Sequence, residues 1–189
     1  MTAFEWGFQE APKNLHTYLF FTFGYHVFDF IEHMFFKEKQ SDFQELLLHH
    51  IATCCLYFAF LLSNMMGVGA VIAWFHDVAD IFVTLSRVLN CLGMEKVTPV
   101  AFISLLTVWI YTRNLILPIY IYHTFKDLKH AEAAIQPLAT IQGIFLCVLQ
   151  LLHFWWTVMM SKILCKLVKT GEQKDTLNRP EDAKAEKQD

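Results

Sequence analysis

The chain has 189 residues, of which 55% are hydrophobic and 15% aromatic, and its formal net charge at neutral pH is −3. This apolar content exceeds that of an ordinary soluble domain and places the chain among the integral membrane proteins. The slightly acidic balance offers no basic surface, which excludes nucleic acid as a partner. Five cysteines, an odd number without a C-x-x-C pair, lie in or beside apolar runs and are interpreted as small apolar side chains.

The N-terminal segment, residues 1–14, contains Glu5, Glu10 and Lys13 but no basic stretch followed by a short apolar core. It therefore does not have the pattern of a cleavable secretory signal or of an arginine-rich transit peptide. We expect insertion into a membrane to depend on the internal helices.

Five apolar runs follow, and each is long enough to cross a hydrocarbon core of roughly 30 Å as a helix of about 20 residues. They cover residues 15–36, 44–63, 68–92, 99–123 and 138–168. Continuous apolar runs are typical of helices, whereas the strands of a membrane barrel would alternate. The sequence predicts an all-α, polytopic membrane bundle of about five transmembrane helices, organised as one domain over residues 15–168.

The last run predicts a helix that leaves the membrane with a basic end, and residues 169–189 are almost without apolar side chains. We expect these final residues to form a solvated C-terminal tail. Lysines near the helix ends gather on one side of the predicted bundle, and the positive-inside rule places that side, with the C-terminus, in the cytosol or an equivalent compartment. The lysines of this side are Lys37, Lys39, Lys96, Lys162, Lys166 and Lys169.

Ionisable side chains occur inside the predicted helices, where they are costly and point either to a function or to pairing within the bundle. Run 44–63 contains the adjacent pair His49 and His50, and run 68–92 contains His76, Asp77 and Asp80 in the sequence WFHDVAD. A buried carboxylate that orients an imidazole can support acid–base or acyl-transfer chemistry. The alternative is a purely structural histidine pair.

The second of these helices also carries Thr84, which shares one helix face with His76 and Asp80 because the three are spaced four residues apart. A salt bridge to Arg87 or Arg113 would be enough to explain the aspartates without any catalytic role. Both interpretations remain open at the level of the sequence.

The first predicted helix is unusually polar, with His26, Asp29, Glu32 and His33, of which residues 26, 29 and 33 share one face. Three interpretations are open: a buried contact with another subunit, internal pairing with the region around His49, or a metal site completed by a second helix. The repeated histidine boxes of membrane-bound desaturases and hydroxylases are absent from the sequence, which excludes that enzyme class.

These motifs carry a family likeness: the chain from about Tyr18 to Leu167 resembles the ceramide synthase branch of the TLC-domain membrane proteins. The stretch DFQELLLHHIAT resembles the surroundings of the family's paired histidines, and SNMMGVGAVIAWFHDVAD resembles the segment that ends in its histidine-aspartate-x-x-aspartate run. The later stretches YTRNLILPIYI and LQLLHFWW resemble the family's last two helices. The ordered pair of motifs is more specific than either motif alone.

The resemblance implies an N-acyltransferase that moves a fatty acyl group from acyl-CoA to the amine of a sphingoid base inside a helical barrel, in the endoplasmic reticulum membrane. It implies no metal and no cofactor, since acyl-CoA is a substrate, although a bound lipid is expected. The implied site consists of catalytic His49, His50, Asp77 and Asp80, and of substrate-binding His76, Thr84 and Arg113.

The sequence differs from the family pattern at Thr84, where members usually have glutamate, and at Gly67, where they usually have arginine. The family's barrel also has an additional helix in front, so we expect a pocket that is open sideways. The alternative interpretation is a non-catalytic accessory subunit of a larger membrane complex, for example a respiratory assembly of the mitochondrial inner membrane, with a lipid in the old pocket. Membrane lipids are expected partners in both cases, and other membrane subunits in the second.

Overall fold

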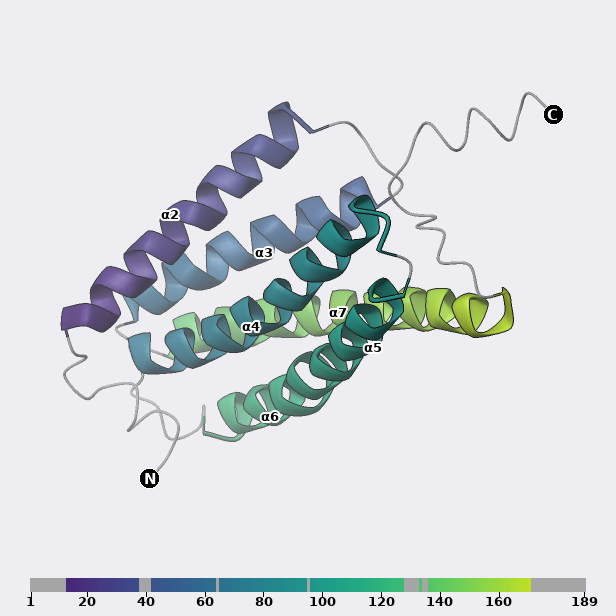
Figure 1. Ribbon diagram of the computed structural model, residues 1–189. Helices are drawn as coiled ribbons and strands as arrows, with labels where there is room; N and C mark the ends of the chain where they lie inside the picture. The colour runs from purple at the N-terminus through teal and green to yellow at the C-terminus, as the bar shows by residue number, and fades with distance from the viewer. Residues whose placement is uncertain are drawn as a thin grey trace.

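The computed structural model describes residues 13–37, 42–63, 65–94, 96–127, 133 and 136–170 (Figure 1). Within these residues all regular secondary structure is helical, which confirms the predicted all-α class. The predicted N-terminal segment and C-terminal tail lie almost entirely outside the described residues. The helices are α2 (Lys13–Phe35), α3 (Phe43–Leu62), α4 (Met66–Cys91), α5 (Thr98–Trp109), the π-helical segment η1 (Ile110–Ile116), α6 (Leu117–Asp127) and α7 (Gln136–Thr170).

The five predicted apolar runs coincide with these helices, and the fourth run corresponds to α5, η1 and α6 in unbroken succession. Four helical stretches are long and apolar enough to cross a membrane: Phe43–Leu62, Met66–Cys91, Thr98–Lys126 and Gln136–Lys169. Helix α2 is long enough, with 23 residues, but it is not among these four. Its acidic residues and histidines interrupt the apolar run, so its polar face requires partners inside the bundle.

The turn between α4 and α5 shows how local sequence ends one helix and begins the next. Gly93 has a φ of 66°, a conformation that glycine adopts without the steric cost of a Cβ atom. Its N–H donates to the Asn90 carbonyl over 3.1 Å, and the Met94 N–H donates to the Leu89 carbonyl over 3.1 Å. This pair of bonds is a Schellman cap, and Pro99 then occupies the first turn of α5, where its missing N–H costs little.

Helix α3 packs along α7, α4 packs along α5, and α2 lies across α3 and α4 (Figure 1). The interface between α3 and α7 contains buried apolar side chains such as Leu56 and Leu149. A second cluster joins α4, α5 and α7 and includes Ala79 and Leu105. These interfaces direct one face each of α3, α4, η1 and α7 toward a common interior.

The outer surface of the bundle is strongly apolar. Large hydrophobic side chains are exposed along the helices, for example Leu151, Phe154 and Trp155 of α7. A soluble monomer rarely exposes so much continuous apolar surface, whereas a surface in contact with hydrocarbon requires it. The structure therefore supports the assignment as a polytopic integral membrane protein.

Candidate functional site

Histidines from three helices converge in the interior of the bundle. The imidazole of His153 in α7 lies 5.2 Å, between ring centroids, from that of His76 in α4, and 6.2 Å from that of His49 in α3. His153 is fully buried. One fully buried and two half-buried imidazoles within such distances form a polar centre in an otherwise apolar bundle, which is the placement expected of a functional site in a membrane protein.

Arg113 is the cation of this centre, and its side chain is only 2% exposed. Its Nη2 donates to Asp80 Oδ1 over 2.9 Å and to the His76 carbonyl oxygen over 3.1 Å. Its Nη1 lies 2.9 Å from His153 Nε2, and its guanidinium lies over the Trp109 ring at 4.7 Å. A buried charge is tolerated when it is paired and hydrogen-bonded in this way.

Arg113 belongs to the π-helical segment η1, at the middle of an otherwise continuous α-helical rod. The wider turn of a π-helix interrupts the regular hydrogen-bond ladder and is often found at functional sites. Here it coincides with the residue that links α4 to α7. The sequence had suggested Arg113 as one of two partners for the aspartates; Asp80 pairs with it, while Arg87 is exposed.

The hydrogen bonds assign tautomers to two of the histidines. Arginine can only donate, so His153 Nε2 must accept the Arg113 bond and the proton lies on Nδ1. His76 Nδ1 lies 2.8 Å from the Ile72 carbonyl oxygen, so this nitrogen carries the proton and Nε2 presents a lone pair. That Nε2 is buried and has no hydrogen-bond partner among the described residues.

The adjacent histidines of α3 point in different directions. His49 lines a small internal cavity and its ring lies 5.4 Å from that of Trp156 in α7. His50, 4% exposed, instead faces α2, where its Nδ1 lies 3.5 Å from Asp29 Oδ2. Successive helical residues are about 100° apart around the axis, so the two imidazoles lie in different environments.

The polar face of α2, left open by the sequence, pairs internally with α3. Asp29 approaches His50, and His33 Nε2 lies 3.1 Å from the Phe43 carbonyl oxygen. The other Asp29 oxygen accepts from Lys37 Nζ over 3.2 Å. Partial burial opposes the charge of Lys37, but Asp29 and Glu32 outweigh it and raise the pKa of Lys37 above its usual value.

A metal site was the third interpretation of this face. In the part of the chain that the structure describes, no group of three or more histidine, cysteine or acidic side chains has the arrangement of a metal site. The contacts of Asp29 and His33 with α3 support internal pairing of this face.

Two of the predicted site residues lie away from the histidine centre. Asp77 accepts a hydrogen bond of 2.7 Å from the hydroxyl of Tyr18 in α2, and it thereby ties α4 to α2. Thr84 is exposed on the outer side of α4. The other five predicted residues, His49, His50, His76, Asp80 and Arg113, lie in or beside the centre.

Sequence reasoning missed His153 as a member of the site, although the stretch LQLLHFWW was noted. A histidine within an apolar helix is itself a signal, but nothing local to α7 indicates that it faces Arg113, which is 40 residues away in the sequence.

The cavity beside these residues has a volume of about 30 Å³ and is lined by side chains of α2, α3, α4 and α7. Its lining includes His26, His49, His76 and Asp80, and the Asp80 side chain is 58% exposed. Gly69 forms part of the wall: a Cβ atom there would lie 2.8 Å from Phe60 Cγ. The histidines therefore border a small space whose lining includes the exposed carboxylate of Asp80. The lateral opening expected from the sequence stays a prediction.

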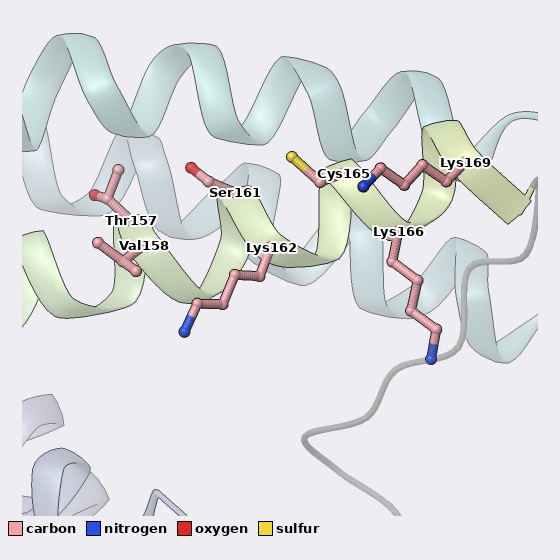
Figure 2. Close-up of a pocket in the computed structure, with 7 residues that line it drawn as sticks. All are labelled: Thr157, Val158, Ser161, Lys162, Cys165, Lys166 and Lys169. Carbon is pink, nitrogen blue, oxygen red and sulfur yellow. The ribbon is translucent and has the colours of Figure 1, made fainter.

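A larger groove, of about 540 Å³, lies on the C-terminal part of α7 and is open to the outside (Figure 2). Its seven lining residues all belong to α7 and include Lys162, Cys165, Lys166 and Lys169. At 1.5 Å per residue, the 35 residues of α7 extend over about 52 Å, which exceeds the bilayer core of roughly 30 Å. This basic end matches the predicted membrane-proximal lysines, and it contains none of the residues of the histidine centre.

Comparison with known proteins places these features in context. A protein-family model described as the TLC domain matches residues 3–162. The chain is 26% identical to ceramide synthase hyl-2 of Caenorhabditis elegans over 176 residues, covering 88% of this chain and 54% of the relative. It is 26% identical to ceramide synthase 1 LOH3 of Arabidopsis thaliana, covering 86% of this chain and 55% of the relative.

A third relative is the sphingosine N-acyltransferase LAG1 of Saccharomyces cerevisiae, which is 28% identical over 149 residues, covering 74% of this chain and 36% of the relative. The chain thus spans about half the length, or less, of the curated relatives it matches.

Proposed function

Because the chain belongs to the TLC-domain family of membrane proteins, we propose that it is a ceramide-synthase-like N-acyltransferase that transfers a fatty acyl group from acyl-CoA to the amine of a sphingoid base. The names of its relatives support this choice of reaction and substrates. An endoplasmic reticulum membrane is the location that we propose with this activity.

The observation that carries the proposal is the convergence of His49, His76 and His153 around a buried, arginine-linked centre. Transfer of an acyl group to an amine requires a group that handles the acyl carbonyl and a group that removes a proton from the amine. Neutral imidazoles supply both, and burial among apolar helices keeps competing water away from the thioester.

Within the histidine pair, His49 is the residue that lines the cavity, and we assign the contact with the acyl group to it. His50 contacts Asp29 and lies beside His33, with ring centroids 5.2 Å apart. We therefore assign His50 a positioning role, in which it holds the first turns of α3 against α2. Arg113 holds Asp80 and His153 in place and provides the positive charge of the centre.

The test uses the purified protein in lipid nanodiscs with a long-chain acyl-CoA and a sphingoid base, with the amide product measured by mass spectrometry. We expect product from the natural chain and none from His49→Ala. His123→Ala is the matched control, because His123 is exposed on α6. A folded natural chain that forms no amide across a range of acyl-chain lengths would overturn the proposal.

A second candidate function is a non-catalytic subunit of a membrane assembly. The observation that favours it is the cavity volume of about 30 Å³, which is far too small for an acyl chain or a sphingoid base. Extraction in mild detergent distinguishes the two functions. Stoichiometric co-purification of other membrane proteins, with no amide formed, would support the subunit function, whereas an active monomer would exclude it.

A further inference from the structure

Three buried polar atoms that have no hydrogen-bond partner among the described residues belong to side chains lining the cavity. They are His49 Nδ1, Thr53 Oγ1 and His76 Nε2. A buried polar atom without a partner costs free energy, and native proteins rarely leave several together. Three such atoms on side chains that line one cavity therefore point to a missing binding partner at that position.

The size and lining of the cavity define what that partner is. A space of about 30 Å³ accommodates one or two water molecules, and a water requires two to four polar partners to be held there. An apolar group of this size would leave all three atoms unsatisfied. The partner is thus a single small group that both donates and accepts hydrogen bonds.

We infer that this cavity is a subsite for one small polar group, a water molecule in the resting protein and the primary amine of the acyl acceptor during the reaction. The second half of the inference rests on the proposed function. The NH₂ group of a neutral primary amine is close to a bound water in size. Like water it donates two hydrogen bonds, and its one lone pair accepts a third. The rest of the acceptor then extends past Asp80, whose exposed side chain lies at the rim.

The tautomer of His76 gives this subsite a direction for proton transfer. Its Nδ1–H is bound to the Ile72 carbonyl oxygen, so Nε2 is the atom that accepts a proton from the amine. The amine nitrogen forms the new C–N bond with the acyl carbonyl carbon, and the C–S bond of the thioester breaks. One amine proton moves to His76 Nε2, and His76 then returns this proton to the departing CoA thiolate, which leaves as the thiol.

The first half of the inference is tested without any activity. A crystal structure grown from the lipidic cubic phase, at a resolution that shows waters, is expected to contain a water within hydrogen-bond distance of His76 Nε2 and Thr53 Oγ1. Thr53→Val, which removes the hydroxyl at nearly constant shape, is expected to lose or displace this water. Thr124→Val is the control, since Thr124 is buried on α6 and its hydroxyl is already bound to the Tyr120 carbonyl. A dry cavity, or one filled by apolar density, would overturn the inference.

The second half is tested by the size of the acceptor amine. The natural chain is expected to acylate a sphingoid base at least tenfold faster than its N-methyl analogue, because the extra methyl group does not fit. Thr53→Ala enlarges the cavity and is expected to narrow this ratio, whereas Thr124→Ala is expected to leave it unchanged. Equal rates for both acceptors with the natural chain would overturn the amine subsite. If no acceptor were acylated at all, the proposed function would be wrong, and the water site would still be decided by the crystal structure alone.

Discussion

Arg113 and His153 are 40 residues apart in the sequence, and their side chains meet over 2.9 Å in the interior of the bundle. One belongs to the π-helical segment and the other to α7. Through the same guanidinium, His76 and Asp80 of α4 are joined to this pair. A single buried side chain thus connects η1, α4 and α7, and the hydrogen bonds of Trp109 and Asn114 to Thr157 add to the link between the α5–η1 rod and α7.

Replacing Arg113 is therefore expected to destabilise the fold. Arg113→Met keeps much of the side-chain volume but removes every hydrogen bond to Asp80, His76 and His153. The expected loss is about 2–4 kcal/mol of unfolding free energy, because buried acceptors are left without a donor. Thermal or denaturant unfolding in nanodiscs measures it. Arg87→Met, an exposed arginine of α4, is expected to change stability by no more than about 0.5 kcal/mol; equal effects of the two variants would contradict the role of Arg113.

Asp29 is expected to act on the reaction through His50. Asp29→Asn removes the charge that faces His50 Nδ1 at 3.5 Å, so the imidazole is held less firmly. We expect kcat to fall by up to about 100-fold, at the low end of effects seen for acid–base groups, with little change in KM. Glu32→Gln is the matched control, since Glu32 also contacts Lys37 but is not in contact with His50. A rise in KM with kcat unchanged would argue against a positioning role for Asp29.

Gly69 is expected to tolerate no side chain. A Cβ atom there would lie 2.8 Å from Phe60 Cγ, and Phe60 is buried in the core between α3 and α7. Gly69→Ala should therefore cost about 1–3 kcal/mol, the usual range for overpacking. Gly24→Ala provides the contrast, because a Cβ atom at Gly24 meets nothing within 4 Å and alanine favours a helix by about 0.5–1 kcal/mol. A lower unfolding free energy for Gly69→Ala and a higher one for Gly24→Ala would confirm the close approach of α3 and α4.

The natural cysteines test the orientation of the helices. Cys91 at the end of α4 and Cys165 beside the basic end of α7 are exposed. Because both adjoin lysine-bearing segments on the side predicted to be cytosolic, a membrane-impermeant maleimide should label both from the same side of sealed vesicles. Variants that keep only Cys91 or only Cys165 separate the two signals, and a variant that keeps only Cys54, within α3, serves as the protected control. Labelling of Cys91 and Cys165 from opposite sides would contradict the orientation.

The helix positions could be predicted closely because they depend on local properties. An apolar run of sufficient length must form a helix in hydrocarbon to satisfy its own backbone, and the run from 44 to 63 corresponds to α3 within one residue at each end. The π-helical segment was not predicted, although Pro118 follows it two residues beyond its end. A proline inside a helix lacks the N–H of the regular hydrogen-bond ladder, so it is a local signal for an irregular turn. The interior partners of Arg113 could not be read from that signal.

The candidate site was predictable in its residue types but not in its pairings. The cost of burying a charge in a membrane drew attention to His49, Asp80 and Arg113 from their sequence positions alone. The direction in which each side chain points depends on how α2, α3, α4 and α7 rotate against one another, and this separated His50 from His49 and left Thr84 on the outer surface.

The sequence by itself determined that this chain is a membrane bundle of helices with the two family motifs, because hydrophobic length and residue order are local quantities. Only the tertiary structure decided that Arg113 binds His153 and that Asp29 faces His50. It also decided that three side chains lining one cavity each have a polar atom without a partner among the described residues. Those contacts join residues from different helices, and they arise from the packing of whole helix faces, which no stretch of sequence specifies alone.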